Sequence, residues 1–130
     1  MSAALPADGR DVRAVLSALG RAEGVRGALL VAADGLVIAA ALPEGIGVEA
    51  LSALAATLGR ELELRASLAG HGAFSLAYFE AEAGSLILGT TAIGFVIVLT
   101  EAGCDEAPLA EALHGAIDVI ERAWGAPALA

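Results

Sequence analysis

Two short apolar segments, residues 28–32 and 36–41, are separated by the turn sequence Ala33-Asp34-Gly35. An Asp-Gly pair between apolar runs is a strong signal for a β-hairpin, because glycine adopts positive φ angles without steric cost. Neither run alternates polar with apolar residues, and this pattern is typical of strands buried on both faces. The hairpin is therefore expected in a sheet that other layers cover on both sides.

Apolar periodicity on either side of this hairpin predicts the remaining elements. Three helices are expected, at residues 11–22, 48–68 and 108–124. Three further strands are expected, at residues 74–79, 86–88 and 95–99. The last two strands are apolar on consecutive residues and are therefore central. The first alternates large apolar residues with smaller, more polar ones, which indicates an edge strand.

These elements combine into one layered domain. Short connections require antiparallel pairing of the strands, and strands that are apolar on both faces require helices on both sides. The predicted fold class is α/β, a three-layer α/β/α sandwich with a five-stranded antiparallel sheet and the order α-β-β-α-β-β-β-α. The domain is expected to span residues 9–124, with flexible tails at 1–8 and 125–130.

The apolar content exceeds what one small core requires. Hydrophobic residues make up 58% of the 130 residues, against roughly 45–50% in ordinary domains. Either a buried interface with another chain or the abundance of alanine explains this excess. The helix over 48–68 is expected to pack on the sheet through one stripe, formed by Val48, Leu51, Leu54, Ala55, Leu58 and Leu62.

A neighbouring flank of the same helix carries small or apolar residues. They are Ala50, Ala53, Thr57, Leu64 and Leu68. This flank is either the margin of a wide core stripe or a helix–helix contact between two copies. The edge strand must also be covered or paired, and its residues are Phe74, Ser75, Leu76, Ala77 and Tyr78. The flank and the edge strand together predict a dimer.

The charge balance excludes several classes of partner. The formal net charge is −9, with 16 acidic residues, seven arginines and no lysine. Nucleic acid requires a basic patch, and an anionic membrane surface attracts basic segments, so neither partner is expected. Residues 83–100 are uncharged, but glycine and threonine interrupt them and no basic residue flanks them. We interpret this segment as two strands and expect no membrane insertion.

Catalytic and metal-binding patterns are missing from the sequence. His71 and His114 have no cysteine, aspartate or histidine at metal-ligand spacing. Cys104 stands beside two acidic residues, which disfavour a reactive thiolate. As the single cysteine, it excludes an intramolecular disulfide and fits a reducing compartment, so we expect a cytoplasmic protein. A phosphate-binding loop requires lysine. The sequence therefore predicts a protein that is not an enzyme and takes no cofactor or metal.

Several motifs occur in a defined order along the chain. They are LxxL at 16–19, GVRGALLV at 24–31, DGLVIA at 34–39, GSL at 84–86 and GFVIVL at 94–99. In this order the chain resembles the Roadblock/dynein light-chain family, including its bacterial MglB-like members. The resemblance implies a homodimer or heterodimer in which third strands pair and second helices lie side by side on one sheet face. It also implies a small Ras-like GTPase as partner, which bacterial members of the family serve as activators of GTP hydrolysis or as scaffolds.

The partner-binding surface is expected where the loop before the second helix meets the polar face of that helix. Its residues are Pro43, Glu44, Glu49, Ser52, Arg60 and Glu63. An ordinary solvated helix face is the alternative for these residues. For the whole chain, the sequence favours a non-catalytic dimeric regulator or scaffold of a small Ras-like GTPase. The alternative is a sensory or small-molecule-binding module of similar α/β/α architecture, which would need convergent polar groups on an apolar wall.

Overall fold

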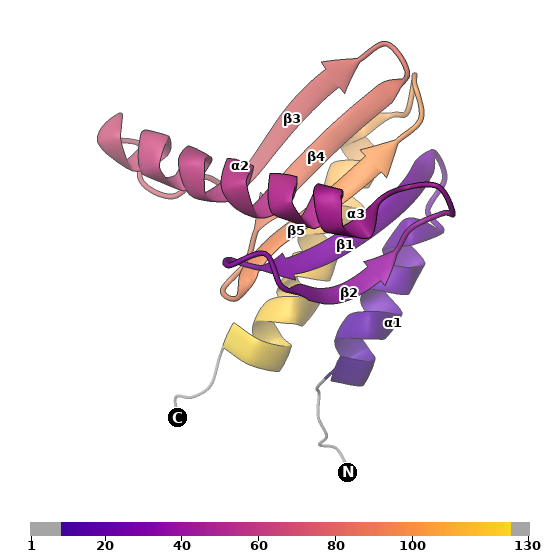
Figure 1. Ribbon diagram of the computed structural model, residues 1–130, viewed down its shortest axis with the longest axis horizontal. Helices are drawn as coiled ribbons and strands as arrows, with labels where there is room; N and C mark the ends of the chain where they lie inside the picture. The colour runs from indigo at the N-terminus through magenta and orange to yellow at the C-terminus, as the bar shows by residue number, and fades with distance from the viewer. Residues whose placement is uncertain (1–8, 126–130) are drawn as a thin grey trace.

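The computed structural model describes residues 9–125, and the chain forms three helices around one sheet (Figure 1). The helices are α1 (Gly9–Gly20), α2 (Val48–Leu68) and α3 (Glu106–Ile120), and a π-helical turn, η2 (Glu121–Gly125), follows α3. The strands are β1 (Val25–Ala32), β2 (Val37–Ala41), β3 (Leu76–Ala81), β4 (Gly84–Thr90) and β5 (Gly94–Thr100). The predicted order of elements is confirmed.

All five strands join one antiparallel sheet in the order β2-β1-β5-β4-β3. Helices α1 and α3 cover one face of this sheet and α2 crosses the other (Figure 1). Neighbouring residues of a central strand therefore point into different layers: Leu29 packs toward α2, whereas Leu30 packs toward α1 and α3. Both are completely buried, and the predicted three-layer sandwich is confirmed.

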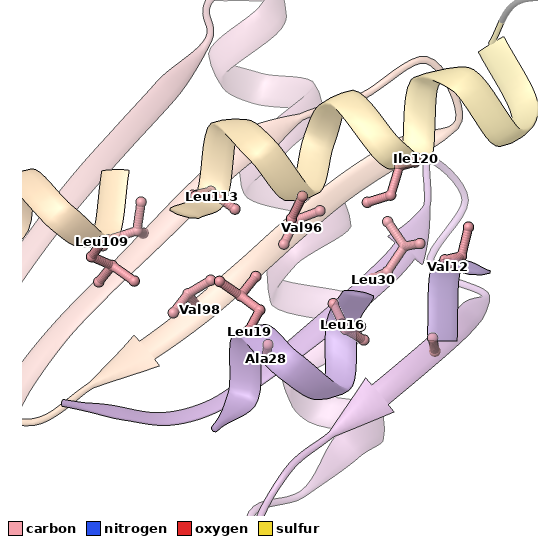
Figure 2. Packing of buried hydrophobic residues seen from close by; sticks show 13 residues of the cluster. Val12, Leu16, Leu19, Ala28, Leu30, Val96, Val98, Leu109, Leu113 and Ile120 are labelled. Carbon is pink, nitrogen blue, oxygen red and sulfur yellow. The ribbon is translucent and has the colours of Figure 1, made fainter. Parts of the chain in front are cut away.

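The core between the sheet and the α1–α3 layer is the larger of the two (Figure 2). Its buried residues include Val12, Leu16, Leu19, Leu30, Val96, Leu113 and Ile120. Full burial of such a side chain contributes about 1.5–3 kcal/mol. The helical spacing of these residues in α1 and α3 explains why both helices lie on this face.

The β1–β2 hairpin has the predicted turn. Gly35 has a φ of 95°, a conformation that strains any residue with a side chain. The carboxylate of Asp34 accepts a hydrogen bond from the backbone N–H of Leu36 at 3.1 Å. Asp34 and Gly35 therefore fix the reversal together, one through its side chain and the other through its backbone freedom.

Several element boundaries differ from the prediction by a few residues, and two of these differences have a clear structural cause. The third strand begins at Leu76 instead of Phe74, since Phe74 packs in the α2 cluster and Leu76 in the opposite one. Helix α3 begins before Pro108, because the carboxylate of Asp105 caps it by accepting a hydrogen bond from the N–H of Ala107. Most of the two predicted tails, residues 1–8 and 126–130, lies outside the described residues.

The uncharged segment over residues 83–100 forms β4, β5 and their connecting turn, as predicted. Within the described range 9–125, no helix is both long enough and apolar enough to cross a membrane.

Candidate interaction surfaces

Helix α2 contacts the sheet through small residues. Its buried positions are Ser52, Ala55, Ala56 and Gly59. Gly59 lies directly on the ring of Phe95 in β5, and a β-carbon at this position would come within 2.5 Å of that ring. A glycine in a helix interior costs about 1 kcal/mol relative to alanine, so its presence indicates that α2 approaches the sheet unusually closely.

This close contact corrects the predicted orientation of α2 at two positions. Ser52 was expected on an exposed polar face, but it is 5% exposed and its hydroxyl donates to the carbonyl of Glu49 at 2.9 Å. The stripe expected to face the sheet is confirmed except at one position: Ala55 is buried in the core on this side of the sheet, and Val48, Leu51, Leu58 and Leu62 pack against that core. Leu54 was also expected to face the sheet, but it is 47% exposed. The small residues occupy the closest approach, and the leucines pack to one side of it.

One flank of α2 binds the turns at one end of the sheet. Arg60 donates a hydrogen bond to the carbonyl of Ala33 in the β1–β2 turn. Glu63 accepts a hydrogen bond from the hydroxyl of Thr90, at the end of β4, over 3.2 Å. These two residues were predicted to bind a partner. In the structure they already hold α2 across the end of the sheet.

The opposite flank of α2 is lined by leucines and faces a part of the sheet that α2 leaves open. These residues are Leu51, Leu58 and Leu62, which are partly buried against the sheet, and Leu54, which is exposed. The open part of the sheet holds a shallow groove of about 320 Å³, lined mainly by apolar residues such as Phe79, Leu86 and Leu99, with Arg26 and Glu80 also in its lining. Figure 1 shows β3 and β4 continuing past α2 at this end. We call the leucine flank and this groove together the apolar trough.

The trough borders the edge strand β3. This strand pairs with β4 alone, so its other side is unpaired in the single chain and the predicted edge position is confirmed. Tyr78 and Phe79 are 39% and 38% exposed, on opposite faces of the sheet. Of the predicted interface residues, Leu76, Ala77 and Tyr78 lie in this strand. Ser75 precedes it and its carbonyl accepts from the N–H of Thr90 at 3.1 Å.

A third surface lies along the top of α2, pointing away from the sheet. We call it the α2 crest, and it consists of Ala50, Ala53, Thr57, Leu64 and Leu68, all exposed. Leu64 and Leu68 are 51% and 71% exposed, which is unusual for leucine in a helix. Pro43, Glu44 and Glu49 are exposed at its N-terminal end. The sequence placed the five crest residues on one flank beside the sheet-facing stripe, and in the structure they point away from the sheet.

On the other side of the sheet, a hollow of about 610 Å³ separates the end of α1 from the loop before α3. Its lining includes Glu23, Glu101, Cys104, Asp105 and Leu109. The sulfur of Cys104 packs closely against Gly24. Within the described residues, no group of three histidine, cysteine or acidic side chains is placed to hold a metal ion.

Three solved structures share this fold. MglB of Myxococcus xanthus superposes with a TM-score of 0.83 at 18% identity, over 93% of this chain and 92% of that one. The gliding protein MglB of Thermus thermophilus gives a TM-score of 0.82 at 20% identity, over 95% and 96% of the two chains. A structure of MglB with a tetrameric arrangement gives 0.80 at 19%, over 92% and 91%.

Sequence relatives lead to the same family. Three uncharacterized proteins of Methanocaldococcus jannaschii are 34% identical to this chain over 88 residues. The match covers 68% of this chain and 75–77% of the relatives. The model of the Roadblock/LC7 domain matches residues 11–101, which extend from the first turns of α1 to the end of β5. The chain belongs to the Roadblock/LC7 family.

Proposed function

We propose that the protein acts as a dimer whose interface consists of the β3 edge and the apolar trough. The observation that carries this proposal is the continuity of two exposed features, an unpaired strand edge and an apolar surface next to it. An open edge is a site for pairing with another strand, and pairing of two β3 strands would extend the sheet across both copies. A two-fold axis through this pairing brings the leucine flank of each α2 toward the other copy.

The predicted interface is thereby refined in one respect. Helices that lie side by side on one sheet face contact each other through their flanks. The leucine flank is such a surface, whereas Ala50, Ala53, Thr57 and Leu64 lie on the crest. We therefore propose that the crest remains open in the dimer and that Leu54 and Phe79 become buried.

We further propose that the dimer is a non-catalytic, cytoplasmic regulator or scaffold that binds a small Ras-like GTPase. The GTPase is the partner that the family resemblance implies. The two crests provide a surface for it, since each carries exposed leucine and alanine over five turns of helix. The exposed acidic residues Glu44 and Glu49 at the N-terminal end of each crest would orient the partner and speed association. Binding should therefore weaken as salt screens these charges.

A capture experiment tests this proposal. The immobilised protein is incubated with lysate from its own source in the presence of GDP or a non-hydrolysable GTP analogue, and bound proteins are identified by mass spectrometry. Enrichment of a Ras-like GTPase on the wild-type protein, with loss on Ala53→Arg, is the expected result. Thr90→Ser, which keeps the hydroxyl that Glu63 accepts from, is the matched control and should retain capture. Absence of any GTPase, or equal capture by Ala53→Arg, would contradict the proposal.

The hollow beside Cys104 favours a second candidate function. Its volume of about 610 Å³ falls within the range of small-molecule sites, so a ligand-binding module is the alternative. Its acidic lining would select a cationic ligand. A thermal-shift screen with polyamines and amino acids tests this alternative, and Glu101→Gln should abolish any shift that a ligand of this hollow produces.

A further inference from the structure

The turn between β4 and β5 is a rigid unit. The hydroxyl of Thr91 accepts hydrogen bonds from the backbone N–H groups of Ile93 and Gly94, at 3.2 and 3.0 Å. The backbone N–H of Thr91 donates to the carbonyl of Gly94 at 2.8 Å, and the N–H of Thr90 donates to the carbonyl of Ser75 at 3.1 Å. Because these bonds fix the turn internally and attach it to the segment before β3, the turn moves as one body.

Two carboxylates hold this turn, one from each side of the sheet. On one side, Glu63 of α2 accepts a hydrogen bond from the hydroxyl of Thr90 at 3.2 Å. On the other side, Glu121, the first residue of η2, accepts a hydrogen bond from the backbone N–H of Ala92 at 2.9 Å. Hydrogen bonds to an ionised acceptor are stronger than those between neutral groups. This chain of contacts therefore connects α2 with the end of α3 around the end of the sheet.

The part of α2 that this chain reaches is weakly attached to the sheet. The fully buried residues of α2 end at Gly59, and Leu62 is only half-buried. Figure 1 shows the C-terminal end of α2 projecting past the strands. Leu64 and Leu68, which form the C-terminal half of the crest, are exposed. Because little apolar burial holds these turns of the helix in place, their position depends on polar contacts such as that of Glu63.

The other end of this chain of contacts has an uncommon backbone geometry. Helix α3 changes at Glu121 into the π-helical turn η2. π-Helical turns are rare, and many of them lie at functional sites. Here the change occurs at the residue whose side chain holds the β4–β5 turn. The conformation of η2 therefore decides whether the carboxylate of Glu121 reaches that turn.

We propose that the β4–β5 turn couples η2 to the C-terminal half of the crest. When η2 is formed, Glu121 holds the turn, and the turn fixes α2 through Thr90 and Glu63. When η2 unwinds, Glu121 releases the turn, and the C-terminal end of α2 becomes mobile on the opposite face of the sheet. The coupling is independent of what binds the crest, whereas its effect on partner binding rests on the proposed function.

Hydrogen–deuterium exchange of the full chain tests the coupling. Glu121→Ala removes the acceptor for the N–H of Ala92 and should speed exchange of the amides at residues 61–68 by about threefold or more. Glu121→Gln keeps an acceptor oxygen and should exchange like the wild-type protein. Glu111→Ala is the matched control, because it removes an exposed carboxylate earlier in α3, and it should leave the amides of α2 unchanged.

Thr90→Val completes a double-mutant cycle with Glu121→Ala. It removes the hydroxyl that donates to Glu63 and should speed exchange of the same α2 amides. The double variant should show little further increase, because both substitutions break one chain of contacts. Helix α1 separates this coupling from a general loss of stability. It shares a core with α3 (Figure 2), so general destabilisation would speed exchange in α1 at least as much as in α2.

Three results would each overturn the proposal: unchanged exchange of α2 in Glu121→Ala, an equal increase in α1, or additive increases in the double variant. GTPase capture by Glu121→Ala is a separate readout and should fall by about twofold or more. If the wild-type protein captures no GTPase, the proposed function fails, and the exchange measurement still decides the coupling.

Discussion

The contact between Gly59 and Phe95 supports a prediction that can be worked out from the structure. In Gly59→Ala, the new methyl group would lie 2.5–2.6 Å from three atoms of the Phe95 ring, about 1 Å inside van der Waals contact at roughly 3.5–4.0 Å. The ring is 1% exposed and has no free space to move into. Overpacking of this kind lowers the free energy of unfolding by about 1–3 kcal/mol. The higher helix propensity of alanine raises it by about 1 kcal/mol.

The net expectation for Gly59→Ala is a loss of up to about 2 kcal/mol in the free energy of unfolding. Gly115→Ala in α3 is the matched control, because its β-carbon would meet nothing within 4 Å. It should stabilise by up to about 1 kcal/mol. Thermal unfolding at one fixed protein concentration measures both, at roughly 4 °C per kcal/mol for a domain of this size. Equal stabilisation by both substitutions would refute the close contact of α2 with β5.

Substitutions at two further positions test local features of the fold. Gly35→Val should destabilise by about 1–3 kcal/mol through backbone strain at its φ of 95°, and Gly35→Asn should cost less, because asparagine tolerates this conformation. A melting temperature of Gly35→Val within a degree of wild type would exclude the assigned turn. Asp105→Ala removes the N-cap of α3 and should lower the free energy of unfolding, measured by chemical denaturation, by about 1 kcal/mol. An unchanged denaturation midpoint would show that the cap is dispensable.

The sheet could be predicted from the sequence because its signals are local. Asp34 and Gly35 specify a turn by their own chemistry, and the uninterrupted apolar runs of β1 and β5 indicate burial on both faces. Neither signal depends on contacts with residues that are distant in the chain. The same holds for the helical spacing of Leu109 and Leu113 in α3, which are both buried as expected.

The residues of α2 that make the closest contact with the sheet could not be predicted in this way. Hydrophobicity ranks leucine above alanine, serine and glycine as a core residue, so the pattern favoured a leucine stripe against the sheet. The closest approach of a helix to a sheet instead selects residues without bulk, as at Ser52 and Gly59. The hydrogen bonds of Arg60 and Glu63 connect positions 27 residues apart in the chain, and no local pattern indicates them. The isolated glycine at position 59 was the one available signal.

The central claim is that the β3 edge and the apolar trough bury against a second copy. Light scattering at low micromolar concentration tests it most directly. The wild-type protein should have twice the chain mass of 12.9 kDa. Leu54→Arg should have the mass of one chain, because it would bury an unpaired charge in the trough. Ala53→Arg, on the crest, should keep the mass of two. A monomeric wild-type protein, or a Leu54→Arg variant that remains dimeric, would contradict the account.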